Sequence, residues 1–281
     1  MTPLVTAAVL LAAVTHAAWN ALAHKITDKL AGFALISGGG LVIGLALTPF
    51  AAFPAAAAWP YLLSSAVIHI AYYALLMTSF RLGDFGQAYP LARGTAPLVV
   101  TVLAALLADE VPDARAAAGI ALACAGLTGV ALWGLRGHRP DRAAIGAALA
   151  TGLTIAAYTV VDGLGVRASG SSLGYIAWLM AVQGTVLPAY VLWRRRGGTV
   201  AALRPFAALG LTGAALSVAA YALVLWAQTR APLAPVAALR ESSVVVGAVI
   251  GAVCFKERFG GPRIAAAGLL VVGIGLMLHA G

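Results

Sequence analysis

The sequence has 281 residues, of which 62% are hydrophobic and only 10% are charged. A soluble domain contains about 25% charged residues, so this composition excludes a soluble globular protein. The formal net charge of +9 would favour nucleic-acid binding on a soluble face, but here the basic residues lie mostly in short connections between apolar runs, and we expect no nucleic-acid partner.

Apolar runs of about 20 residues recur along the whole chain, which is the length that a helix needs to cross a bilayer. None of them shows the polar–apolar alternation of strands in a membrane barrel. We therefore predict an all-α integral membrane protein with ten transmembrane helices, the first of them retained and not cleaved as a signal peptide. The predicted spans are 3–23, 31–51, 59–80, 85–107, 113–135, 143–163, 172–193, 204–227, 233–255 and 260–280.

The basic residues predict the orientation of these spans. Thirteen of the 18 lysines and arginines lie in connections after odd-numbered spans, and three lie in the alternate connections. Cytoplasmic connections are rich in lysine and arginine, so we expect both termini outside the cytoplasm of a multi-pass protein in the cell's inner (plasma) membrane. The thirteen are Lys25, Lys29, Arg81, Arg136, Arg139, Arg142, Arg194, Arg195, Arg196, Arg204, Lys256, Arg258 and Arg263.

The chain also contains an internal repeat. A shift of 147 residues aligns Arg93 with Arg240 and Glu110 with Glu257, and residues 113–134 resemble residues 261–281. The repeated unit has about five helices, and an odd number inserts the second copy from the opposite side of the membrane. We predict inverted repeats over 1–137 and 143–281 in a single membrane domain, with a linker at 138–142. Inverted repeats are typical of transporters whose substrate site lies at the repeat interface.

Two further motifs end the fourth and ninth predicted spans: "ADEVPDAR" at 108–115 and "FKERFGGPR" at 255–263. With ten spans and the inverted duplication, the chain resembles the drug/metabolite transporter superfamily, EamA type. The "GE" signature that this type has after span four is present here only as "DE". The resemblance implies a small-molecule exporter, with aromatic amino-acid exporters of the YddG kind as the nearest group. It also implies a central cavity surrounded by spans 1, 3, 4, 6, 8 and 9.

Four ionisable residues stand out within predicted spans: Arg93, Asp162, Arg240 and Glu241. Such residues cost about 2.5–3.5 kcal/mol each on insertion scales, so they are functional candidates. Their formal charges sum to zero, which is also compatible with structural ion pairs that hold helices together. Asp162 or Glu241, if it had no permanent partner, could instead bind the proton that couples transport.

The two arginines lie about seven or eight residues into their helices, and Pro97 and Pro235 are expected to interrupt the same helices. An arginine side chain can bind both oxygens of a carboxylate. We hypothesise that Arg240 or Arg93 binds a substrate carboxylate, with Arg240 the favoured residue. The alternative is that both arginines pair with acidic neighbours.

Aromatic residues in the spans predict an apolar binding cavity with few polar groups, which suits a hydrophobic amino acid. Cys124 and Cys254 lie in spans and suit packing better than a disulfide or a metal site, and we expect no cofactor. The predicted substrate-binding residues are Trp19, His69, Tyr72, Tyr73, Tyr89, Arg93, Tyr158, Trp178, Tyr221, Arg240 and Glu241.

These features predict a secondary transporter of small metabolites, most simply an exporter of hydrophobic or aromatic amino acids that works as a monomer by alternating access. The sequence has no G-x-x-x-x-G-K motif, so a gradient must drive transport. A transporter or flippase of other cargo, such as a lipid-linked sugar, nucleotide or drug, is the main alternative. A channel would need a continuous polar stripe. A membrane enzyme would need clustered carboxylates or histidines. We do not expect the protein to be an enzyme.

Overall fold

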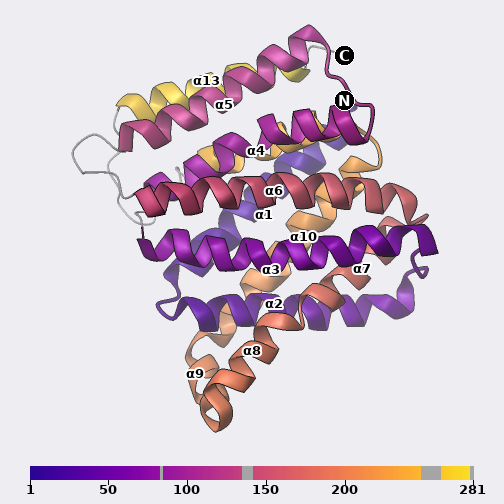
Figure 1. Ribbon diagram of the computed structural model, residues 1–281, viewed down its shortest axis with the longest axis vertical. Coiled ribbons are helices and arrows are strands. Elements are labelled where there is room, and N and C mark those ends of the chain that lie inside the picture. The colour runs from indigo at the N-terminus through magenta and orange to yellow at the C-terminus, as the bar shows by residue number, and fades with distance from the viewer. Residues whose placement is uncertain (83–84, 135–141, 248–260, 279–281) are drawn as a thin grey trace. The chain divides into compact units, whose positions relative to one another are not determined.

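The computed structural model describes the whole chain except residues 83–84, 135–141, 248–260 and 279–281 (Figure 1). The regular secondary structure of the described residues is helical, and they contain no strand. The α-helices are α1 (Pro3–Lys25), α2 (Lys29–Leu47), α3 (Trp59–Leu82), α4 (Phe85–Leu107), α5 (Ala114–Gly134), α6 (Arg142–Ala168), α7 (Ser172–Gln183), α8 (Val186–Arg195), α9 (Thr199–Leu203), α10 (Ala207–Gln228), α11 (Leu233–Arg240) and α13 (Gly261–Leu278).

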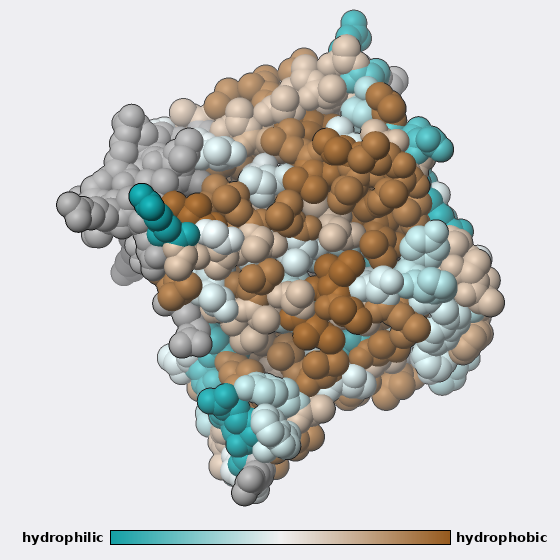
Figure 2. Space-filling view, viewed as in Figure 1, coloured by the Kyte–Doolittle hydropathy of each residue, from teal (hydrophilic) through white to brown (hydrophobic). Residues whose placement is uncertain are grey.

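Six helical segments are long and apolar enough to cross a membrane. They are Pro3–Lys25, Lys29–Phe50, Ala56–Ser79, Arg142–Ala168, Ser172–Arg195 and Thr199–Gln228. Shorter apolar helices occupy Leu91–Leu107, Ala114–Gly129 and Ala267–Leu278. Apolar residues cover much of the face seen in Figure 2, whereas hydrophilic residues gather near α8 and α9. The prediction of an all-α multi-pass membrane protein is therefore confirmed.

The seventh predicted span, 172–193, is not one continuous helix. Its two parts, α7 and α8, are separated by a turn at Gly184 and Thr185. The Ser37 hydroxyl in α2 donates a hydrogen bond of 3.3 Å to the Gly184 carbonyl oxygen, which compensates for the interrupted helical ladder. A Cβ at Gly184 would lie 2.8 Å from the backbone nitrogen of Leu41, so the turn needs glycine to pack against α2.

The ninth predicted span is also interrupted, but at a different place from the one expected. Helix α11 ends at Arg240, and its C-cap is Glu241, whose backbone N–H bonds the carbonyl oxygens of Ala238 and Leu239. Helical turns resume at Ser243. The expectation that Pro235 interrupts this helix is wrong, because Pro235 lies in the first turn, where a backbone N–H has no intrahelical partner to lose.

The described chain forms two compact units. Unit 1 contains Met1–Leu10, Ala71–Val160 and Arg230–Gly281, and unit 2 contains Leu11–Ile70 and Val161–Thr229. Within unit 1, α5 packs along α13 and α4 packs against α11; within unit 2, α2 packs against α7 and α10. The pairs α5–α13, α4–α11 and α2–α7 join helices at equivalent positions of the two predicted repeats, whereas α2–α10 does not. The repeat boundaries at 137 and 143 stay predictions, and the linker lies outside the described residues up to residue 141.

Glycines allow the helices of both units to approach closely. In unit 2, a Cβ at Gly44 of α2 would lie 2.7 Å from the Ala177 carbonyl oxygen of α7. In unit 1 the approach is reciprocal, because a Cβ at Gly119 or at Gly273 would lie 2.6 Å from the other residue's carbonyl oxygen. Lipid is as apolar as leucine, so helix association in a membrane depends on such close backbone packing.

A partly exposed ion pair joins the ends of two helices in unit 2. Asp28 caps α2 by accepting a hydrogen bond of 3.0 Å from the Ala31 N–H, and it also pairs with Arg195 at 2.5 Å. Partial burial alone would raise the pKa of Asp28, but the bonds from Ala31 and Arg195 outweigh it, so this pKa lies below its usual 3.8. The stabilisation is therefore present above pH 3.8 and is lost as the pH falls through the lowered value.

The substitution Gly273→Leu should lower the free energy of unfolding by about 1–3 kcal/mol, because the leucine side chain must displace the α5 backbone. Leucine at Gly268, in the same helix, is the matched control, since a Cβ there has no atom within 4 Å. Thermal unfolding of the purified protein in detergent measures both variants. Equal melting temperatures for the two would contradict the close α5–α13 packing.

Candidate functional site

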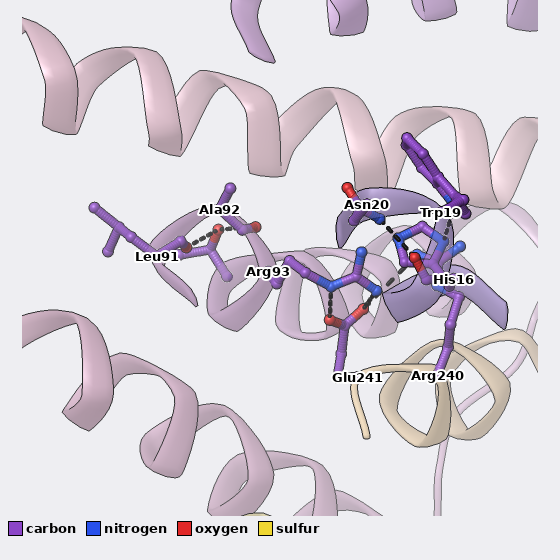
Figure 3. A network of polar contacts seen from close by, with 9 residues as sticks. His16, Trp19, Asn20, Leu91, Ala92, Arg93, Arg240 and Glu241 are labelled. Carbon is purple, nitrogen blue, oxygen red and sulfur yellow. Dashed lines mark hydrogen bonds and ion pairs between the residues drawn. The ribbon is translucent and has the colours of Figure 1, made fainter. Parts of the chain in front are cut away.

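Two of the predicted intramembrane charges form a buried ion pair in unit 1. Arg93 of α4 donates from Nε to Oε2 of Glu241 at 2.5 Å and from Nη2 to Oε1 at 3.1 Å (Figure 3). The Arg93 side chain is 4% exposed and that of Glu241 is fully buried. Two parallel bonds between a guanidinium and a carboxylate are the strongest form of this contact in a protein. Arg93 therefore occupies both carboxylate oxygens of Glu241 in this structure.

The second arginine lies beside the same carboxylate. Nη2 of Arg240 is 3.8 Å from Oε1 of Glu241, which is an ion-pair distance but too long for a hydrogen bond. The buried Nε of Arg240 has no hydrogen-bond partner among the described residues. Arg93, Arg240 and Glu241, the arginine–glutamate cluster, thus bring two positive charges to one negative charge.

The helix interruption after Arg240 places more unused polar atoms next to this cluster in sequence. The hydroxyl oxygens of Ser242 and Ser243 are buried and, like Nε of Arg240, have no hydrogen-bond partner among the described residues. Buried polar atoms are nearly always hydrogen-bonded, so three unused ones within four residues mark a place that can bind a polar group. The two serines were not among the predicted site residues, although their position after the paired charges in "LRESS" was a signal.

Three predicted tyrosines form an aromatic cluster elsewhere in unit 1. The Tyr72 ring lies 5.3 Å from the ring of Tyr73 and 5.5 Å from that of Tyr158, the latter in an edge-to-face arrangement. Tyr72 and Tyr158 are buried, and Tyr73 is half-buried. The backbone of Tyr89 lies in α4, but its side chain lies outside the described residues. The cluster offers apolar surface with phenol hydroxyls, and its role as a cavity wall stays a prediction.

The other intramembrane carboxylate, Asp162, lies in unit 2 among neutral hydroxyls. It is fully buried in α6, and its Oδ1 accepts a hydrogen bond of 2.8 Å from the Tyr175 hydroxyl. Its Oδ2 accepts a bond from the Tyr221 hydroxyl. Ser65 also hydrogen-bonds to this carboxylate, and His69 interacts with it electrostatically. We call these five residues the Asp162 cluster.

Sequence reasoning predicted three members of this cluster and missed Ser65 and Tyr175. Ser65 lies four residues before His69 on α3, a spacing that places both on one helix face. Tyr175 reaches Asp162 because position 165, one turn further along α6, is glycine; a Cβ there would lie 2.4 Å from the Tyr175 hydroxyl oxygen. Nothing in the sequence singles out this pairing, which depends on how α7 packs on α6.

The two predicted tryptophans of unit 2 lie in other surroundings. Nε1 of Trp19 donates to Nδ1 of His16 at 3.3 Å, one turn earlier in α1 (Figure 3). Trp178 packs against Trp59 and Phe53, with ring centroids 5.6 and 5.2 Å away. Phe53 is largely exposed. A group of this kind beside a connection is typical of an interfacial aromatic belt.

The described residues contain no group of three or more histidine, cysteine or acidic side chains that could bind a metal ion. Cys124 is buried and free. Cys254 lies outside the described residues.

Comparison with known proteins identifies the family. The model of the EamA-like transporter family matches the chain twice, at residues 4–132 and 142–279. The chain belongs to the EamA-like transporter family. This confirms the resemblance to the EamA type of the drug/metabolite transporter superfamily, and the two matches correspond to the two predicted repeats. As a member of this family, the protein is a membrane transporter of small molecules.

A solved structure supports the fold of this EamA-like transporter. A solved structure described only as "Crystal structure of protein" is 20% identical and has a TM-score of 0.70, with 99% of this chain and 97% of that chain covered. At this identity the likeness concerns the fold alone. Among proteins with curated descriptions, none matches the chain.

The arginine–glutamate cluster predicts an order of stabilities. Glu241→Gln should lower the free energy of unfolding by about 3–5 kcal/mol, because it leaves two guanidiniums together without a counter-charge. Arg93→Met should lower the free energy of unfolding by less, because Arg240, 3.8 Å from Glu241, can pair with the carboxylate in place of Arg93. Thermal unfolding in detergent measures both.

The matched control for these variants is Asp28→Asn, which removes a partly exposed ion pair and should cost no more than about 1 kcal/mol. If Arg93→Met proved as destabilising as Glu241→Gln, Arg240 would not be able to replace Arg93.

Proposed function

We propose that this EamA-like transporter exports small metabolites that have a carboxylate group, with hydrophobic and aromatic amino acids as the favoured cargo, by alternating access. Family membership supports the transport of a small molecule. The carboxylate is inferred from the arginine–glutamate cluster, and the apolar part of the cargo from the tyrosines of the same unit. We further propose that the protein works as a monomer in the inner membrane.

The single observation that supports this proposal most directly is the state of Arg240. It is 3% exposed, its Nε has no hydrogen-bond partner among the described residues, and the nearby carboxylate is already bound in two places by Arg93. A buried arginine is costly unless its charge is compensated. An incoming carboxylate would compensate the charge of Arg240 and accept hydrogen bonds from the unused donors. The Ser242 and Ser243 hydroxyls add donors suited to the same anion.

The tyrosine cluster supports an apolar or aromatic side chain on the cargo. The rings of Tyr73 and Tyr158 lie 5.3 and 5.5 Å from the ring of Tyr72, and aromatic rings prefer offset or edge-to-face partners. A phenyl or indole group would gain these contacts, whereas a strongly polar side chain would lose hydration without compensation. Uptake competition with a panel of the twenty amino acids should therefore favour aromatic and branched aliphatic members.

Arg240→Met should reduce the transport of a labelled aromatic amino acid in proteoliposomes by about 10- to 100-fold, because a hydrogen-bonded charge pair with the cargo contributes about 1.5–3 kcal/mol. Arg240→Lys should be intermediate, since lysine keeps the charge but not the two-pronged donor. The carboxamide analogue of the cargo should not compete with the acid in the unmodified protein.

The matched control is Arg115→Ala, which removes an exposed arginine from α5 of the same unit. This variant should transport normally. The role of Arg240 would be refuted by an Arg240→Met protein that folds, as judged by size-exclusion chromatography and melting temperature, and transports at the unmodified rate. Transport of none of the twenty amino acids would instead refute the class of cargo.

The proposed orientation places the connection after the second span outside the cytoplasm and the connection after the seventh span inside it. We expect a membrane-impermeant maleimide to label Ala57→Cys in intact cells, in a background without Cys124 and Cys254. Gly197→Cys should be labelled only after permeabilisation. Both positions are exposed, so their accessibility within the protein is comparable. The reverse labelling pattern would show that the protein has the opposite orientation in the membrane.

A further inference from the structure

The Asp162 cluster differs from the arginine–glutamate cluster in the kind of partner that it gives a buried carboxylate. The oxygens of Asp162 accept hydrogen bonds from the hydroxyls of Tyr175, Tyr221 and Ser65. Within the described part of the chain, the lysine and arginine ion pairs do not include Asp162. Apart from His69, these partners are neutral donors, so the negative charge of Asp162 is compensated only when His69 or the carboxylate itself binds a proton.

The charged and titratable groups that face Asp162 come from three helices. Helix α3 contributes His69, α7 contributes Tyr175 and α10 contributes Tyr221. On its own helix, Arg167 lies more than one turn away, is exposed, and donates from Nε to the Gln228 carbonyl oxygen at 2.7 Å. His69 is thus the group among these that can bring a proton to the carboxylate near neutral pH.

The hydrogen bonds of His69 define a path to Asp162. Its Nδ1 lies 2.9 Å from the Ser65 carbonyl oxygen and 3.1 Å from the Ser65 hydroxyl. A carbonyl oxygen can only accept, so Nδ1 bears the hydrogen in this arrangement, and Nε2 is the basic nitrogen of the neutral ring. The Ser65 hydroxyl then accepts from Nδ1 and donates its own hydrogen to Asp162.

The glycine at position 165 shows that the surroundings of this carboxylate are specific. A side chain at that position would collide with the Tyr175 hydroxyl, at 2.4 Å from its Cβ, and so remove one of the donors. His69 and Tyr221 also pack edge-to-face, with ring centroids 5.7 Å apart. Side chains from α3, α6, α7 and α10 therefore fix one carboxyl group among hydroxyls and one imidazole.

We propose that Asp162 is a reversible proton-binding site of this transporter, filled through His69 and Ser65, and that its protonation couples cargo movement to a proton gradient. The coupling part rests on the proposed transport function. A proton taken up at Nε2 of His69 is matched by transfer of the Nδ1 hydrogen to Ser65 and of the Ser65 hydroxyl hydrogen to Asp162. This leaves a neutral imidazole in its other tautomer, an unchanged serine and a carboxylic acid at Asp162.

The first experiment tests proton binding without any cargo. Infrared difference spectra of the purified full-length protein between acidic and alkaline pH should contain the carbonyl band of a protonated carboxyl group in the unmodified protein. Asp162→Asn should lose this band, and Asp162→Glu should retain it at a shifted frequency. Asp113→Asn, which removes an exposed carboxyl group from the start of α5, should leave it unchanged.

The proton path through Ser65 is tested by the rate at which the carboxyl group loses its proton. After a rapid jump to alkaline pH, Ser65→Ala should lose the band more slowly than the unmodified protein, because the hydroxyl that links His69 to the carboxyl is absent. A band that persists in a folded Asp162→Asn variant would overturn the site. An unchanged rate in Ser65→Ala would overturn the path. Melting temperature and size-exclusion profile establish that each variant is folded.

The second experiment tests coupling in proteoliposomes with a labelled aromatic amino acid. The ratio of the transport rates with and without an imposed pH gradient should exceed one in the unmodified protein and fall to one in Asp162→Asn, whatever the absolute rates. A sodium gradient without a pH gradient should have no effect. Stimulation by sodium and not by protons would overturn the proposal. If no cargo is transported, the proposed function fails, while the infrared result still decides the proton site.

Discussion

The interior of a bilayer contains no water, so every charge placed there must be compensated by the protein, and this constraint organises the structure. Glu241 illustrates it most directly. This carboxylate is fully buried and lies between two arginines, one bound by two hydrogen bonds and one at 3.8 Å. The contact joins α4 to the end of α11, which are equivalent helices of the two predicted repeats. A single acidic residue thereby holds together two helices that are far apart in the sequence.

The same constraint gives the two intramembrane carboxyl groups different chemistry. Glu241 faces two guanidiniums, and Arg93 binds both of its oxygens. Asp162 faces hydroxyls and a histidine, which can serve either form, since a hydroxyl both donates and accepts. Two titratable groups in contrasting environments are a common way for a protein to separate a binding task from a proton-transfer task. The proposed separation places the carboxylate-binding residues in unit 1 and the proton-binding residue in unit 2.

Most of the architecture could be predicted from the sequence, because twenty consecutive apolar residues have few alternatives to a membrane helix. The spans, the repeat and the intramembrane charges were all visible there. The interruptions at Gly184 and after Arg240 were not, because a turn within a span depends on partners such as Ser37 that compensate its backbone. For the same reason the pairing of Glu241 with Arg93, and of Asp162 with Tyr175, required the packing of helices to be known. The sequence identified the charges but left their partners open.

The excess of positive charge in the arginine–glutamate cluster has a consequence for the energetics of the membrane. One elementary charge that crosses a potential of 100 mV changes the free energy by about 2.3 kcal/mol. With no anion bound, the cluster has one net charge on which the membrane potential can act if the helices move. With a carboxylate bound beside Arg240, that charge is balanced. A cargo with one net negative charge would therefore confine the action of the membrane potential to the empty form. A zwitterionic amino acid, whose ammonium group adds a positive charge, would leave one net charge on both the empty and the loaded forms.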